Sequence, residues 1–172
     1  VTQLRLSGAR CRIARRGNAF ASLEDDAFTL RAEAPEDWKQ LLQSCADEAP
    51  ERFAFLWSLD ESDPSADMLG TDGLFHLTQA IEIISPAAKL HLDVITRAAQ
   101  AVGHDNVISL AQSPSIGLMR VIANEHNNFT CRSIDLPAEA SAADNALVWN
   151  ELLQEDTERE IAFRGEARYV RR

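Results

Sequence analysis

The side chains with the greatest chemical capability in this 172-residue sequence are widely scattered. The four histidines form no pair at metal-ligand spacing, and the cysteines are equally far apart. These residues are His76, His91, His104, His126, Cys11, Cys45 and Cys131. We therefore expect no metal site, and we interpret the histidines as polar or half-buried side chains and the cysteines as reduced thiols packed in the interior.

Three further groupings have the composition of a site but lack its pattern. His91 and Asp93 alternate along a predicted strand, which favours a satisfied polar face over a catalytic pair. Ser58 is not surrounded by a nucleophile elbow. An acidic segment could hold Ca²⁺, but it lacks the glycine and the closing glutamate of a calcium loop, so we expect a solvated loop. Its acids are Asp60, Glu61, Asp63 and Asp67.

A nicotinamide-dependent reductase needs two features that this sequence lacks. Dinucleotide binding requires Gly-x-Gly-x-x-Gly after a first strand, because the backbone must approach the pyrophosphate closely. The seven glycines never form that pattern: Gly8, Gly17, Gly70, Gly73, Gly103, Gly117 and Gly165. Carbonyl reduction also requires a tyrosine with a lysine and a serine nearby, whereas the single tyrosine, Tyr169, lies in the last predicted strand. The sequence therefore predicts no catalytic residue and no cofactor-binding residue in this segment.

A predicted helix over residues 115–126 carries three residues that invite a specific interpretation. Arg120 and Glu125 are five positions apart and would not face each other, so each is expected to bond a neighbouring element. For Arg120 we favour attachment of the helix to the edge of the sheet over binding of a phosphate. Gly117 is expected to permit close packing of this helix on the sheet.

Apolar runs alternate with helical patterns along the chain, which predicts an α/β fold. The predicted fold is a truncated, Rossmann-like parallel sheet with helices on both faces, in one domain over residues 1–172. Strands are expected at residues 11–14, 28–31, 52–59, 90–96, 129–136, 160–164 and 167–170, with 52–59 as a central strand covered on both faces. Helices are expected up to residue 7 with Gly8 as C-cap, from Pro35 onward, and at 68–84, 115–126 and 144–154.

Composition excludes several classes of function. The net charge of −10 argues against binding of nucleic acid, which needs clusters of Lys and Arg. No apolar run approaches the roughly 20 residues that span a membrane, so no membrane association is expected. Unpaired cysteines indicate a reducing cytoplasm.

The segment SPSIGLMRVIANEH, followed by CRSIDLP, resembles a signature of one protein family. It is similar to the structural half of a ketoreductase domain in modular type I polyketide synthases, with a helix of the form P-x-x-G-x-x-R-x-x-x-x-E-H and a strand ending in Asp-Leu. The matching residues are Pro114, Gly117, Arg120, Glu125, His126, Asp135 and Leu136. The pieces APEDWKQLL, FAFLWSLD, VITRAAQAVG and EIAFRGEARYVRR resemble further family elements in the same order.

The resemblance implies a non-catalytic half that packs against a catalytic ketoreductase subdomain of the same polypeptide. That second half would hold NADPH and reduce a β-ketoacyl group on an acyl carrier protein. An enoyl reductase or methyltransferase domain is a further expected neighbour. The family's first strand and most of its first helix are missing, and the sequence starts at Val1, which predicts a segment of a longer polypeptide. Two alternatives stay open: a pseudo-ketoreductase scaffold beside a methyltransferase or enoyl reductase, and an independent, atypical short-chain reductase.

Overall fold

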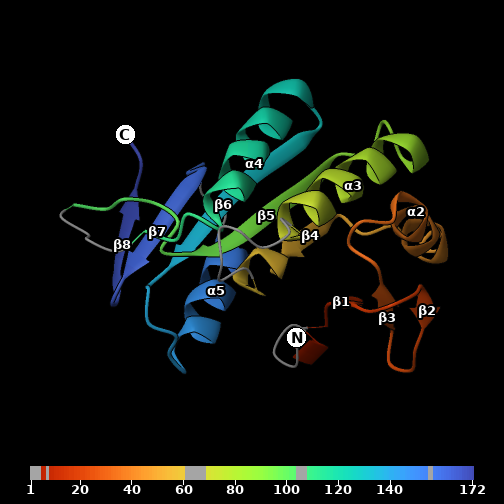
Figure 1. The fold of residues 1–172 in the computed structure, drawn as a ribbon, viewed down its shortest axis with the longest axis horizontal. Helices are drawn as coiled ribbons and strands as arrows, with labels where there is room; N and C mark the ends of the chain where they lie inside the picture. Colours follow the sequence, from red (N-terminus) through yellow and green to blue (C-terminus); the bar gives the residue numbers. More distant parts are fainter. Residues whose placement is uncertain (1–4, 7, 61–68, 104–107, 155–156) are drawn as a thin grey trace.

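The computed structural model describes residues 5–6, 8–60, 69–103, 108–154 and 157–172, and its centre is a five-stranded sheet (Figure 1). The strand order is β4-β5-β6-β7-β8, with four parallel strands and an antiparallel β8 at one edge. These strands are β4 (Arg52–Phe55), β5 (Leu90–Arg97), β6 (Phe129–Leu136), β7 (Glu160–Arg164) and β8 (Ala167–Val170). In the described residues no helix is long and apolar enough to cross a membrane.

Helices cover both faces of this sheet, as the sequence predicts. Helices α3 (Leu69–Ile84) and α4 (Ser113–Glu125) lie on one face, and α5 (Asp144–Leu153) lies on the other (Figure 1). Side chains alternate along each strand, so Leu92 and Val94 of β5 join the core under α3 and α4, whereas Ile95 joins a second core with Leu152 of α5. We call these the α3–α4 face and the α5 face. The α/β, Rossmann-like fold with a largely parallel sheet is confirmed.

The predicted strand–helix–strand unit forms the middle of the sheet. Strands β5 and β6 pair in parallel in continuous register, from Leu90 opposite Phe129 to Arg97 opposite Leu136. Helix α4 connects them and begins two residues earlier than expected, with Pro114 in its first turn, where proline needs no hydrogen-bond donor. Its buried residues Met119 and Ile122 pack into the core of the α3–α4 face.

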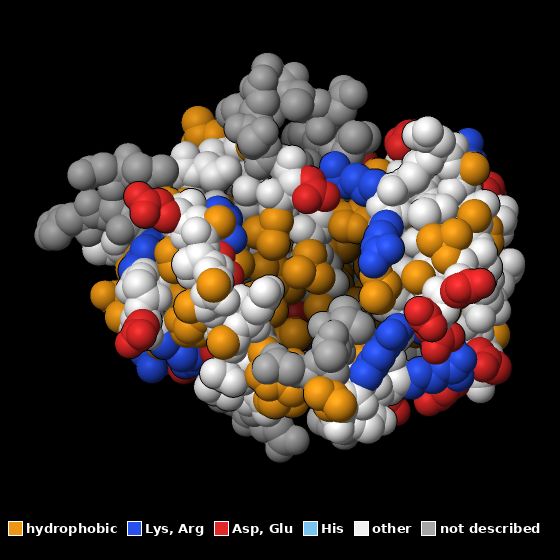
Figure 2. Space-filling view, turned by 90° about the horizontal axis from the view of Figure 1, so that it is seen from below, with side chains coloured by type: hydrophobic (Ala, Val, Ile, Leu, Met, Phe, Trp, Pro, Cys, Tyr) orange, Lys and Arg blue, Asp and Glu red, His pale blue; other side chains and the backbone are white. Residues whose placement is uncertain are grey.

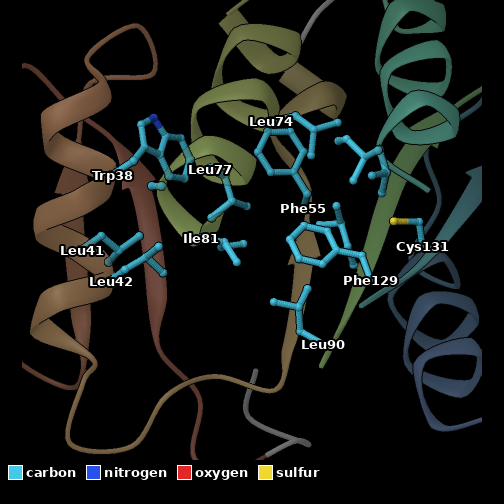
Figure 3. Close-up of a cluster of buried hydrophobic side chains, with 14 of the residues drawn as sticks. Trp38, Leu41, Leu42, Phe55, Leu74, Leu77, Ile81, Leu90, Phe129 and Cys131 are labelled. Carbon is cyan, nitrogen blue, oxygen red and sulfur yellow. The ribbon is translucent and has the colours of Figure 1, made fainter. Parts of the chain in front are cut away.

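A three-stranded sheet and helix α2 (Pro35–Ser44) precede the main sheet. The strands are β1 (Ile13–Arg16), β2 (Ala21–Ser22) and β3 (Ala27–Leu30), in the order β1-β3-β2. Helix α2 starts at the proline, as predicted, and its apolar side packs against α3 (Figure 3). Gly8 has a φ of +88°, a value that suits the predicted C-cap after the helical residues 5–6; residues 1–4 and 7 lie outside the described part.

The prediction of a central strand over residues 52–59 is wrong. Strand β4 ends at Phe55 and lies at the edge of the sheet, and a short 3₁₀ helix, η1 (Trp57–Asp60), follows it. The run is apolar for a different reason, because its residues serve two cores. The Trp57 ring lies 5.0 Å from the Trp38 ring of α2, whereas Leu59 packs against the core under α5. Such a divided run has the composition of a buried strand.

Candidate functional site

The carboxyl ends of the parallel strands are the place where α/β sheets bind ligands, and here a buried carboxylate lies near the end of β6. Asp135, near the end of β6, has no exposed surface. Its Oδ1 accepts hydrogen bonds from the Thr96 hydroxyl (2.6 Å) and the Ala99 backbone N–H (2.8 Å). Its Oδ2 accepts from the Gln100 N–H (3.2 Å) and from Arg164 Nη2 (3.0 Å). Four donors of the chain itself therefore occupy this carboxylate.

A second ion pair binds α5 to the same edge. Arg97, the last residue of β5, donates to Asp144 Oδ2 (2.5 Å) and to the carbonyl of Pro137 (2.7 Å). Burial alone would raise the pKa of Asp144, but hydrogen bonds from Arg97 and Ser141 outweigh it and hold the pKa below its ordinary value. The arrangement fixes the first turn of α5 over the ends of β5 and β6.

A series of buried ion pairs crosses the α5 face. Figure 2 shows the surface of the molecule from below, where hydrophobic side chains gather between charged ones. Arg132 Nε donates to Asp93 Oδ1 (2.7 Å), and Arg132 Nη1 lies 3.9 Å from Glu151. Glu151 in turn accepts two hydrogen bonds from Arg168, at 2.8 and 2.9 Å. This series of ion pairs links β5, β6, α5 and β8. Removing one partner of such a buried pair costs about 3–5 kcal/mol of stability. Arg132 and Glu151 were missed by sequence reasoning.

The polar pair predicted on β5 is divided by the structure. Asp93 is fully buried in this ion chain, whereas His91 is exposed at the start of the strand. Asp93 is thus paired with Arg132 of β6, and the predicted polar face of β5 is satisfied only in part. Among the described residues, Asp93 Oδ2 makes no hydrogen bond, and Arg52 Nε lies 3.6 Å from it.

Arg120 attaches α4 to the sheet, as predicted. Its guanidinium donates two hydrogen bonds to Glu160 at the start of β7, at 2.9 and 2.6 Å, and Arg171 approaches the same carboxylate at 3.1 Å. The hydrogen bond from Arg120 is the main cause that holds the pKa of Glu160 below its ordinary value. Glu125 is exposed, and it is the next residue, His126, that reaches another helix, with Nδ1 2.7 Å from Glu82 of α3.

The remaining candidates also lie apart from one another. Ser58 is fully buried and donates to Ser115 Oγ (3.0 Å), whose oxygen also lies 3.0 Å from Thr71 Oγ1. In the described residues this hydroxyl has hydroxyl neighbours rather than an activating imidazole, so the geometry is that of a packed polar contact. Tyr169 is 45% exposed on β8, far along the chain from these hydroxyls. His76 is partly buried, with Nδ1 3.3 Å from Gln79.

The cysteines are free thiols, and two of the three have the packed environment that the sequence predicts. Cys45 and Cys131 are buried, whereas Cys11 is partly buried and precedes β1 rather than lying in a strand. Burial raises the pKa of Cys131 to about 11 and also raises that of Cys45. No group of three metal-ligating side chains occurs in the described residues. His104 and the acids Glu61, Asp63 and Asp67 lie outside that part of the chain.

The prediction for Gly117 is wrong. A Cβ built at this position has no heavy atom within 4 Å, because Gly117 lies on the exposed side of α4. Close approach occurs instead at Gly73 of α3, where a Cβ would lie 3.1 Å from Trp57 Cε3 and 3.2 Å from Trp38 Cζ2. The sequence signal that could have identified Gly73 is the pair of tryptophans on neighbouring elements.

Solved structures with this fold include ketoreductases. A structure of A-type ketoreductases from a modular polyketide synthase is 26% identical, with a TM-score of 0.69 over 84% of this chain and 32% of that one. A C2-type ketoreductase from a modular polyketide synthase is 27% identical, with a TM-score of 0.66 over 86% and 34%. A keto acid-selecting NRPS module with adenylation, ketoreductase and pseudo Asub parts is 18% identical, with a TM-score of 0.79 over 92% and 14%.

This chain therefore spans about a third or less of the length of these three solved proteins. A search of curated proteins found no match. The family described as beta-ketoacyl synthase-like, N-terminal, matches residues 5–156, which is most of the chain. Its name refers to the synthase, whereas the solved structures are ketoreductases. The chain thus belongs to the beta-ketoacyl synthase-like, N-terminal family and is similar to the ketoreductase domains of modular polyketide synthases.

Proposed function

We propose that this chain is the non-catalytic structural half of a polyketide synthase ketoreductase. The observation that carries the proposal is the carboxyl edge of the sheet, where Asp135 is buried and saturated by four hydrogen-bond donors of the chain itself. Among the described residues, Asp135 is thus held by hydrogen bonds that join β5, β6 and β7, which is the arrangement of a structural carboxylate rather than a reactive one. The similarity to ketoreductase domains supports the assignment to that class of protein.

The residues at this edge do not fit a nicotinamide dinucleotide. A pyrophosphate needs a glycine-rich turn whose backbone N–H groups point at it. Here the turn after β5 directs the N–H groups of Ala99 and Gln100 at Asp135, so a carboxylate of the protein takes the position of an anionic ligand.

The partner in this proposal is a catalytic half of the same polypeptide, which binds NADPH and reduces a β-ketoacyl group on an acyl carrier protein to the hydroxyl. Support comes from the proportions of the matches, because this chain corresponds to about a third of each ketoreductase structure. The structural half contributes a rigid sheet with helices on both faces, held by the ion pairs described above. No step of the reduction falls on its residues.

Calorimetric titration of the chain with NADPH tests the proposal. No saturable heat is expected up to millimolar cofactor, because the edge lacks the phosphate-binding turn. Saturable binding with a micromolar dissociation constant would contradict the proposal and favour the alternative of an independent, atypical short-chain reductase.

A second candidate assignment places the same half in a nonribosomal peptide module. The keto acid-selecting module has the highest TM-score of the structures named above, 0.79, although at 18% identity it shows the fold alone. The sequence that adjoins this chain in its gene distinguishes the two: an adenylation domain supports the peptide module, and an acyltransferase or carrier domain with a ketoreductase supports the polyketide synthase. An adjoining methyltransferase or enoyl reductase without a catalytic ketoreductase half would support the scaffold alternative.

A further inference from the structure

The α3–α4 face of the sheet carries a groove beside α4. The groove has a volume of about 530 Å³. Ile116 and Arg120 of α4 line one wall, residues 99–103 after β5 line another, and Ala162 and Tyr169 lie on its floor. Ala162 and Tyr169 are paired in the register of β7 and β8, so their side chains stand on the same side of the sheet.

The groove lies where this face of the sheet has no helix above it. Helices α3 and α4 lie over β4, β5 and β6, whereas no helix of the described residues lies over β7 and β8 on this side (Figure 1). On β6 the same side carries the fully packed Cys131, but on β8 it carries Tyr169, which is 45% exposed. A sheet normally buries each face against a further layer; here Ala162 of β7 is buried, whereas Tyr169 of β8 is left partly uncovered.

The charges at the groove favour an acidic partner. The guanidinium groups of Arg120 and Arg171 share a single carboxylate, that of Glu160. The three side chains sum to one positive charge, in a chain whose net charge is −10. Arg171 is 59% exposed and reaches Glu160 through Nη1, so its other N–H groups remain accessible to a second carboxylate.

We propose that this groove receives a helix of the catalytic half, one that presents an apolar side chain to Tyr169 and a carboxylate to Arg171. The assignment rests on the proposed function, which supplies the partner. Such a helix would continue the layer formed by α3 and α4 across β7 and β8. Complementary charge would set its orientation, and the exposed tyrosine would provide an aromatic contact of the kind that dominates interfaces.

The test uses the catalytic half, produced as a separate polypeptide, and measures its affinity for this chain by calorimetry. Tyr169→Ala and Arg171→Glu alter the groove. Phe75→Ala is a matched control for the first variant, because Phe75 is an aromatic residue on α3 that is 46% exposed. Arg172→Glu is the control for the second, since Arg172 is also exposed and pairs with Glu158 rather than Glu160. Thermal melting of each variant verifies that it is folded.

We expect each groove variant to weaken binding at least tenfold and each control variant to change it less than twofold. If the unaltered chain binds the catalytic half and all four variants bind equally well, the groove assignment is overturned while the proposed function stands. If the unaltered chain does not bind the catalytic half, the proposed function fails and the groove assignment with it. If Tyr169→Ala abolishes self-association but leaves the affinity for the catalytic half unchanged, the occupant is a second copy and the proposal is again overturned.

Discussion

At the scale of single residues, two helical glycines have opposite surroundings. Gly73 of α3 faces the rings of Trp38 and Trp57, which would lie within 3.2 Å of an added Cβ, whereas an added Cβ at Gly117 of α4 meets open space. Glycine in a helix carries an entropic cost relative to alanine of about 1 kcal/mol. At Gly73 that cost is offset by the contact between α2, α3 and η1, and at Gly117 no contact offsets it.

The two positions should therefore respond in opposite directions to substitution. Gly73→Leu is expected to lower the free energy of unfolding by about 1–3 kcal/mol, because extra atoms displace two packed indole rings. Gly117→Ala is expected to raise it by about 0.5–1 kcal/mol through helix propensity. Urea unfolding of both variants beside the unaltered chain measures the difference. A Gly73→Leu variant as stable as the unaltered chain would show that the tryptophans can move apart.

Residue roles could be predicted from the sequence where they depend on local spacing, and not where they depend on distant pairing. The five-residue separation of Arg120 and Glu125 correctly excluded a contact between them, and so directed Arg120 toward another element. The partner, Glu160, lies 40 positions away and is set by how α4 lies on β7. The ion chain from Asp93 through Arg132 to Glu151 is likewise non-local, because β5 and β6 must pair in register before Asp93 and Arg132 become neighbours.

At the scale of elements, the contact of α4 with β7 depends on a charged cluster rather than on apolar packing alone. Glu160 is 13% exposed and accepts from two arginines, one on α4 and one beyond β8. The bond from Arg120 depresses the pKa of Glu160. Because the pKa of Glu160 is lower in the folded protein than in the unfolded chain, the cluster contributes its full stabilisation at neutral pH. This stabilisation is lost as the pH falls below the ordinary glutamate pKa, about 4, and through the lower pKa of the folded protein.

Glu160→Gln should lower the free energy of unfolding at pH 7 by about 1–2 kcal/mol, a value reduced from that of a fully buried pair because Arg120 is half exposed. The deficit relative to the unaltered chain should shrink as the pH falls below 4. Glu36→Gln is the matched control: Glu36 is 72% exposed and pairs with Lys39 one helical turn away, so its loss should cost less than about 0.5 kcal/mol. Equal effects of the two substitutions at pH 7 would contradict a structural role for the cluster.

Elements could be predicted from the sequence where one period continues over the whole element. Strand β6 keeps the predicted bounds, 129–136, because a turn at 127–128 precedes it and Pro137 follows it. Strands β7 and β8 also keep their bounds, since a turn at 165–166 separates them. The strand predicted over residues 52–59 was wrong because hydrophobicity does not show which core a residue enters. Phe55 enters the core of the α3–α4 face, whereas Leu59 enters the core of the α5 face. A change from strand to 3₁₀ helix between them leaves the apolar pattern unchanged.

At the scale of the whole molecule, the five-stranded sheet ends at two outer strands, and several apolar side chains are exposed. Strands β4 and β8 are the outer strands, and outer strands present unpaired backbone groups that favour association. Leu56 follows β4 and is 46% exposed, and Leu153 at the end of α5 is 56% exposed. These two elements are adjacent, because Arg52 of β4 donates to the carbonyl of Leu152. Apolar surface therefore remains on the α5 face beside the edge of the sheet.

The chain on its own should associate more and melt at a lower temperature than the same chain joined to the catalytic half that we propose as its partner. Interfaces between parts of one polypeptide typically bury about 600–1,500 Å², and burying the apolar surface described above would raise the stability of this half. Sedimentation and thermal melting of the chain alone and of the two-half protein make the comparison. We expect a dimer or larger aggregates from the chain alone, and a monodisperse, higher-melting two-half protein in which both halves unfold together. A monodisperse and equally stable isolated chain would show instead that this sheet needs no partner, and the assignment as half of a ketoreductase would have to be abandoned.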